Sequence, residues 1–183
     1  IQLLNETDYL LEAMHQRNFH RLLKTDKNFI VPKINEKLTT TKILAMEYKK
    51  GITIDQVVHH DQKTKNAIIK NLVELAFKEI FEFNLIQTDP NFANFLYDDT
   101  SKKIVLLDFG ATSNVSKKNI RVFKDILNGL ALDRKEMVEK ALITLKIFSP
   151  NASNSIKNYL LDTIWNLSMP LRKNKEFDFL HCI

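Results

Sequence analysis

The sequence contains few of the residues that shape loops, disulfide bridges and metal clusters. Its 183 residues include only 3 Gly, 4 Pro and 1 Cys. Few Gly and Pro disfavour long loops and favour a mainly helical chain. The lone Cys182 excludes an internal disulfide framework and lacks the neighbouring ligands that a zinc site needs. No apolar run reaches the length of a membrane-spanning helix.

Charge is limited in amount and in pattern. Basic residues exceed acidic ones, which gives a formal net charge of +5 and a pI near 9.2, but Lys and Arg are dispersed along the chain. Dispersed charge is typical of a solvated surface, although it also favours contact with phosphate-bearing ligands or anionic lipid. No basic block alternates with aromatic residues, so a nucleic-acid-binding helical domain is the least favoured class. We expect no nucleic-acid partner.

Two neighbouring motifs carry the strongest functional signal. The chain reads QTDPNFANF at 87–95 and LLDFG at 106–110. An Asp, a following Asn and a later Asp-Phe-Gly, in this order and spacing, are typical of a kinase-type phosphoryl-transfer site. Mg²⁺ prefers hard oxygen ligands and takes only one or two protein groups beside nucleotide phosphates. The pattern therefore predicts Asn94 and Asp108 as Mg²⁺ ligands and Asp89 as the residue that orients the nucleophile.

The same motifs also have a purely structural interpretation. An Asp-Phe-Gly tripeptide recurs by chance, and the Asp-Pro-Asn at 89–91 is a good turn sequence. A predicted hairpin favours the catalytic interpretation, with strands at 95–97 and 104–107 and a turn at 98–101. Because the hairpin pairs these strands, we expect Asn94 and Asp108 to lie side by side.

The rest of the chain is predicted to be mainly helical. The expected elements are a helix at 5–24 capped by Asn5 or Thr7, strands at 34–38 and 42–48, a short helix at 54–58, a long helix from the Asp61 cap to about residue 84, and helices at 117–131 after Ser116, at 134–147 after Asp133 and at about 153–167. This is the order of a kinase core from its first helix onward. We therefore predict an α+β, protein-kinase-like fold within a single partial domain spanning 1–183. Its partial N-lobe (first helix plus two strands) is expected at 1–48 and its mainly helical C-lobe at 49–183.

These stretches together resemble the UbiB family of atypical kinase-like proteins, and within it the mitochondrial branch tied to coenzyme Q biosynthesis. The resemblance covers about residues 3–148, with a weaker similarity at 176–179. The segments that carry it are ETDYLLEA at 6–13, VPKI at 31–34, ME at 46–47 followed by Gly51, FEF at 81–83, QTDPNFANF at 87–95 and LLDFGAT at 106–112. The Gln-Thr-Asp-Pro-Asn form is closer to the mitochondrial branch than to the bacterial one.

The resemblance implies a role for each matching residue. Asp89 would be the catalytic-loop Asp, Asn94 and Asp108 the metal ligands, Glu12 the partner of a lysine that contacts the nucleotide phosphates, and Met46, Glu47 and Tyr48 the hinge lining the adenine pocket. Without the resemblance, the alternative interpretation is that Glu12 is a solvated helix carboxylate and Met46 a core residue. The resemblance further implies ATP and Mg²⁺ as cofactors, mitochondrial localisation, and ATPase activity that supports ubiquinone (coenzyme Q) biosynthesis. The partners expected with it are coenzyme Q biosynthesis proteins and a lipid or anionic membrane surface.

One departure from a complete kinase concerns the N-terminus. Only 1–4 precede the predicted first helix, so this sequence holds no lysine-bearing strand, no phosphate-covering loop and no Lys-x-Gly-Gln segment of the family. It also starts without Met or a targeting segment, and we expect a fragment of a longer protein. Loss of a comparable charge contact lowers a rate on the order of a hundredfold or more. We therefore expect weak or no activity from this chain in isolation.

A second departure concerns the substrate. Gln87, Thr88 and Asn91 stand where typical protein kinases have His, Arg and Lys, and no Ala-Pro-Glu closes an activation segment. Phosphorylation of proteins in trans is therefore disfavoured, and ATP hydrolysis or phosphorylation of a small or lipid-like molecule fits better. The alternative is a catalytically impaired pseudokinase or nucleotide-sensing scaffold.

Overall fold

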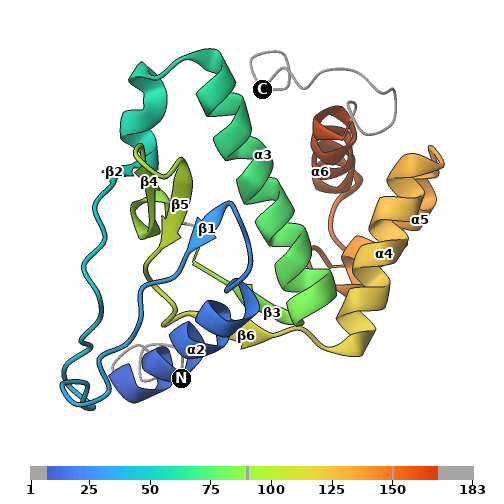
Figure 1. The fold of residues 1–183 in the computed structure, drawn as a ribbon. Helices are drawn as coiled ribbons and strands as arrows, with labels where there is room; N and C mark the ends of the chain where they lie inside the picture. The colour runs from blue at the N-terminus through green and yellow to red at the C-terminus, as the bar shows by residue number, and fades with distance from the viewer. Residues whose placement is uncertain (1–7, 90, 150, 169–183) are drawn as a thin grey trace. The chain divides into compact units, whose positions relative to one another are not determined.

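The computed structural model describes residues 8–89, 91–149 and 151–168 (Figure 1). The chain forms two compact units, Ile1–Val115 and Ser116–Ile183. These units do not correspond to the predicted N-lobe (1–48) and C-lobe (49–183). The lobe boundary at residue 48 stays a prediction. Within the described ranges, no helix combines the length and the apolar character that a bilayer crossing requires. The stretch at 176–179, which carries the weaker part of the family resemblance, lies outside the described residues.

The first described helix, α2 (Tyr9–Leu22), is shorter than the predicted 5–24. The Asp8 side chain caps it by accepting from the backbone N–H of Leu10 at 3.0 Å, as short acidic side chains commonly do. The expected caps, Asn5 and Thr7, lie outside the described residues. The buried side of α2 carries Ala13, Gln16 and Phe19.

The prediction of two strands at 34–38 and 42–48 is wrong. This stretch holds only isolated bridges, Ile34 with Met46 and Thr40 with Ile43. Separate backbone bonds join the two arms, from the Asn35 N–H to the Ala45 carbonyl and from the Glu47 N–H to the Lys33 carbonyl. Between them, the Asn35 carbonyl accepts from the backbone of Leu38 and Thr39, so no continuous ladder forms. The Thr39 hydroxyl also accepts from the Ala45 N–H at 3.2 Å. Polar side chains that bond nearby backbone compete with regular strand pairing.

The main sheet of the first unit has the strand order β1-β5-β4-β2. Its strands are β1 (Phe29–Ile30), β2 (Ile52–Thr53), β4 (Phe95–Asp98) and β5 (Lys103–Leu106). The predicted hairpin is confirmed as β4 and β5, which pair antiparallel with Tyr97 opposite Ile104. β1 lies parallel to β5 on its other side. Central β5 is therefore fully buried at 104–106.

The predicted long helix is confirmed. α3 (Gln62–Lys78) begins at the Asp61 cap after the short helix η1 (Ile54–His59), and is the long green helix in Figure 1. It continues as a π-helix, η2 (Glu79–Phe83), and ends at Asn84, whose φ of 54° is left-handed. The chain then turns into β3 (Leu85–Gln87), which pairs antiparallel with β6 (Thr112–Asn114).

One buried apolar cluster joins the elements of this unit. It includes Phe19 of α2, Leu75 of α3, Leu106 of β5 and Phe109 of the Asp-Phe-Gly segment. Both predicted motifs therefore follow directly from elements of a single core.

Up to residue 168, the described part of the second unit contains the helices α4 (Lys117–Ala131), α5 (Lys135–Thr144) and α6 (Asn154–Leu167). The predicted cap Ser116 is confirmed, and Ser153, predicted as the approximate start of a helix, is the N-cap of α6. The predicted cap Asp133 is wrong, because its φ of 57° reverses the chain after α4 and Arg134 occupies the N-cap position of α5. A Cβ on Gly129 would lie 2.8 Å from the Val138 side chain, so glycine permits the close approach of α4 and α5.

Candidate active site

A hydrogen bond joins the predicted catalytic residue Asp89 to the predicted metal ligand Asn94. A short 3₁₀ turn, η3 (Phe92–Asn94), begins where the Asn91 side chain accepts from the Ala93 N–H. This turn brings Asn94 back toward the start of the loop, and its side-chain Nδ2 donates to Asp89 Oδ2 at 3.3 Å. Because the amide nitrogen faces Asp89, the Asn94 side chain presents its oxygen elsewhere.

A backbone bond joins this loop to the second motif. The Leu107 N–H donates to the Asn94 carbonyl at 3.0 Å, which continues the pairing of Phe95 with Leu106. Asp108 is the next residue along the chain. The register of the hairpin therefore places the backbone of Asn94 opposite Leu107, one residue before Asp108.

The Asp-Phe-Gly segment is anchored through its aromatic residue. Phe109 is 0% exposed, and its ring centroid lies 5.0 Å from that of Phe19 in α2. Phe19 in turn packs edge-on against Phe83 at the end of η2. On the polar side, the Gly110 N–H donates to Asp108 Oδ1 at 2.9 Å. Burial of Phe109 thus fixes where the Asp108 carboxylate emerges.

Glu12 lies against the LLDFG stretch at 106–110, here called the metal motif. Its Oε1 accepts from the Phe109 N–H at 3.4 Å. Burial raises the pKa of Glu12, and the negative charge of neighbouring Asp108 raises this pKa further. Among residues 8–89, 91–149 and 151–168, no lysine forms an ion pair with Glu12. The lysine partner implied by the resemblance stays a prediction.

Thr88 is a contact that sequence reasoning did not assign. Its backbone N–H and its hydroxyl both donate to the Ala111 carbonyl, at 2.8 and 2.7 Å. Thr112 adds a similar hydroxyl bond to the Phe109 carbonyl at 2.8 Å. Thr88 therefore connects the start of the QTDPNFANF stretch at 87–95, here called the catalytic loop, with the end of the metal motif. The sequence offered one signal for this contact, a Thr directly before the predicted catalytic residue Asp89.

The three predicted hinge residues lie in different surroundings. Met46 Sδ accepts from Gln16 Nε2 at 3.5 Å, so it packs against α2. Glu47 is bonded to the Lys49 ammonium at 3.1 Å, which lowers the pKa of the Glu47 carboxyl. Tyr48 is 84% exposed. Their roles in adenine binding stay predictions.

The donor set at the two motifs fits Mg²⁺. Asp89, Asn94 and Asp108 offer carboxylate and amide oxygens, which this ion prefers. In the part of the chain that the structure describes, no group of three or more His, Cys, Asp or Glu side chains forms a metal cluster. A cation held here would take Asn94 and Asp108 as its protein ligands and complete its shell with phosphate oxygens and water, as Mg²⁺ commonly does.

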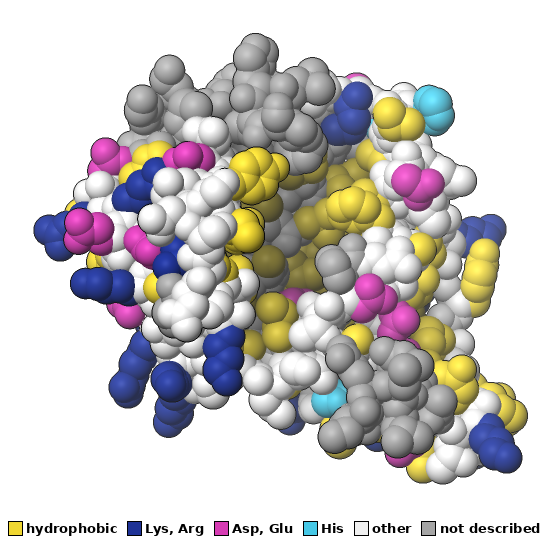
Figure 2. Space-filling view, turned by 180° about the vertical axis from the view of Figure 1, so that it is seen from behind, with side chains coloured by type: hydrophobic (Ala, Val, Ile, Leu, Met, Phe, Trp, Pro, Cys, Tyr) yellow, Lys and Arg dark blue, Asp and Glu magenta, His cyan; other side chains and the backbone are white. Residues whose placement is uncertain are grey.

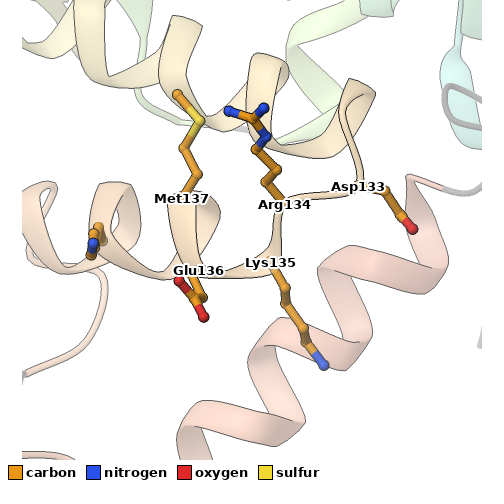
Figure 3. A pocket seen from close by; sticks show the side chains of 6 residues that line it. Asp133, Arg134, Lys135, Glu136 and Met137 are labelled. Carbon is orange, nitrogen blue, oxygen red and sulfur yellow. The ribbon is translucent and has the colours of Figure 1, made fainter.

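A surface hollow at the start of α5 is a poorer candidate. It is lined by Asp133, Arg134, Lys135, Glu136, Met137 and Lys140. Figure 3 shows the Arg134 and Met137 side chains extending to one side and those of Lys135 and Glu136 to the other. Lys135 is already paired with Asp162 at 2.5 Å. The polar side chains that line this hollow therefore do not point toward one common ligand position.

Basic side chains do not form one continuous patch on the face shown in Figure 2. Lys and Arg lie at several separate places there, with Asp and Glu among them. The nucleic-acid prediction stays untested by this view.

The order of elements, the hairpin and the two motifs define a protein-kinase-like α+β fold. A solved Mycobacterium tuberculosis protein, Rv3197 in complex with erythromycin, has the same fold with a TM-score of 0.69, at 18% identity over 88% of this chain and 41% of that one. The chain belongs to the family described by the ABC1 atypical kinase-like domain, whose model matches residues 1–141. The resemblance to the UbiB family is thereby confirmed.

Curated relatives agree with the family. The chain is 38% identical to the mitochondrial atypical kinase COQ8 of Saccharomyces cerevisiae, over 95% of this chain and 35% of that protein. It is 36% identical to the mitochondrial atypical kinase COQ8B of Rattus norvegicus, over 95% of this chain and 33% of the relative. The chain thus spans about a third of the length of these relatives. Both relatives are named as mitochondrial proteins, in agreement with the predicted localisation.

Proposed function

We propose that this chain carries the Mg²⁺-ATP site of an atypical kinase or ATPase. The observation that carries the proposal is the pair of bonds made by Asn94, one from its side chain to Asp89 and one from its backbone to Leu107 beside Asp108. They bring Asn94 beside Asp89 and join its backbone to the strand that leads to Asp108, so the oxygen-bearing side chains of all three residues would lie around one cation. Membership of an atypical kinase family supports the same chemistry.

Each residue would contribute position and charge. Asp108 and Asn94 would hold the cation that neutralises the nucleotide phosphates, and Asp89 would orient the attacking oxygen. In phosphoryl transfer the transition state is loose, so positioning and charge stabilisation supply most of the catalysis. The attacking oxygen would belong to water or to a small or lipid-like acceptor, because Thr88 is engaged with Ala111 where typical protein kinases have Arg.

The biological role that fits is support of ubiquinone (coenzyme Q) biosynthesis in the mitochondrion. The support is the naming of the curated relatives as COQ8 and COQ8B. Coenzyme Q biosynthesis proteins and an anionic membrane surface are the partners we propose with it. A net charge of +5 favours such a surface.

The test is ATP hydrolysis by the protein at its natural length. We expect Asp108→Asn to lower the rate on the order of a hundredfold or more, because a preorganised charge contact is lost. Asp99→Asn is the matched control, since Asp99 is an exposed carboxylate at the turn of the same hairpin. Equal rates for the wild-type protein and Asp108→Asn would show that the metal assignment is wrong.

A pseudokinase or nucleotide-sensing scaffold is the second candidate. The observation that favours it is Glu12, which contacts the metal motif and has no lysine ion pair among the described residues. It predicts that Mg²⁺-ATP raises the melting temperature while no phosphate is released. Phosphate release that Asp108→Asn abolishes would reject this candidate.

A further inference from the structure

Glu79 is a buried acid close to the catalytic loop that neither motif includes. It is 5% exposed and is the first residue of the π-helix η2. Its Oε2 accepts from the Gln87 N–H at 3.3 Å. Gln87 ends β3, two residues before Asp89. The contact therefore spans the turn from helix to strand directly upstream of the proposed catalytic residue.

The Gln87 N–H has no partner in its own sheet. The Asn84 carbonyl bonds the Val115 N–H, and the Thr88 N–H bonds the Ala111 carbonyl. In an antiparallel pair, successive residues direct their backbone groups alternately toward and away from the partner strand. Gln87 lies one position before Thr88, so its N–H points away from β6. The Glu79 carboxylate supplies the acceptor that the sheet does not.

A carboxylate is a costly way to satisfy one backbone donor. Burial raises the pKa of Glu79 to about 7, and no Lys, Arg or His in the described part of the chain forms an ion pair with it. A neutral side chain would avoid the cost of desolvating a charge. π-helical turns occur often at functional sites, where they redirect a side chain. Here the π turn begins at Glu79 itself.

We propose that Glu79 is a positioning residue for the catalytic loop. Its side-chain oxygen fixes Gln87 and so sets the path by which the chain leaves β3 toward Asp89. The Thr88 bonds to Ala111 hold the next residue from the opposite side. Removal of the acceptor leaves a part-buried N–H without its partner, and the loop start then shifts to reach another. The consequence for catalysis rests on the proposed function of Asp89.

The experiment compares three variants in the protein at its natural length. Glu79→Met removes the acceptor at similar size, Glu79→Gln keeps a side-chain oxygen, and Glu82→Met is the control in an exposed position of the same π-helix. We expect Glu79→Met to lower kcat for ATP hydrolysis about tenfold, the equivalent of one lost hydrogen bond. KM for ATP should stay unchanged, because the proposed contact does not reach the nucleotide. Glu79→Gln and Glu82→Met should keep kcat near the wild-type value.

Hydrogen exchange of the 85–94 segment gives a second readout that needs no turnover. We expect faster exchange in Glu79→Met than in the wild-type protein, Glu79→Gln or Glu82→Met. The proposal is overturned if Glu79→Met matches Glu82→Met in kcat and exchange, if Glu79→Gln is as slow as Glu79→Met, or if KM alone changes. If the wild-type protein hydrolyses no ATP, the proposed function fails, and the exchange comparison still decides whether Glu79 positions the loop.

Discussion

The two motifs are attached to the fold in opposite ways. The metal motif carries Phe109, which is 0% exposed and packs on α2, whereas the catalytic loop carries Phe92, which is 61% exposed. Hydrogen bonds of Thr88 and Asn94 hold the loop instead. Apolar burial fixes a segment strongly and as a whole, while single polar bonds contribute less and can be removed one at a time. The metal side of the site is therefore the rigid side.

The largest expected effect comes from the two phenylalanines. Phe109→Ala should lower the free energy of unfolding by about 3–5 kcal/mol, because it removes a fully buried ring and leaves a cavity. Phe92→Ala should change it by less than about 0.5 kcal/mol, as exposed substitutions usually do. Urea denaturation measures both. Similar losses for the two variants would mean that the motifs are anchored alike.

A pH-dependent effect should follow from Glu79. Its pKa is raised from 4.5 to about 7, so between these values the folded protein holds a proton that the unfolded chain has released. Stability attributable to this group therefore falls as pH rises through this window and stays lower above pH 7. At pH 8 we expect Glu79→Gln to be more stable than the wild-type protein by on the order of 2–3 kcal/mol.

The control for this effect is the same pair of proteins at lower pH. Near the unfolded pKa of 4.5 the difference between wild type and Glu79→Gln should disappear, because Glu79 is then protonated in the folded state without cost. Chemical denaturation at several pH values measures the trend. A difference that is constant with pH would show that the Glu79 carboxyl titrates normally.

The smallest effect concerns the polar connection between the motifs. Thr88→Val removes the hydroxyl that donates to the Ala111 carbonyl but keeps the backbone bond to the same oxygen. We expect a loss of about 1 kcal/mol in stability, typical of one hydrogen bond. Thr163→Val on α6 is a matched control, because that hydroxyl bonds a carbonyl within its own helix. A loss several times larger for Thr88→Val would mean that the catalytic loop is as strongly anchored as the metal motif.

Sequence patterns predicted the parts of the fold that depend on local chemistry. The β4–β5 hairpin followed from apolar runs around a polar turn, and α3 from its Asp61 cap and helical spacing. β1 was missed because two residues, Phe29 and Ile30, become a strand only through distant β5. The prediction for 34–48 was wrong because local bonds to the Asn35 carbonyl and the Thr39 hydroxyl interrupt the pairing of the two arms.

For the candidate site, the sequence predicted the motif residues but not the contacts that hold them. Asp89, Asn94 and Asp108 were placed by order and spacing, and the structure joins Asn94 to Asp89 as well as to the strand that precedes Asp108. The contacts of Glu12 and Glu79 with backbone N–H groups could not be predicted, because both depend on tertiary packing of helices against the motifs. No periodic pattern in the sequence marks such a contact.

The most direct test of the central claim is a titration with Mn²⁺-ATP followed by backbone amide NMR, because this paramagnetic ion broadens signals near its site. Our account predicts early loss of the Asn94 and Asp108 signals, with the exposed Asp99 at the turn of the same hairpin less affected. The Asp108→Asn variant should show no such selective loss. Broadening centred on Asp99, or identical behaviour of wild type and variant, would contradict a divalent cation held between the two motifs.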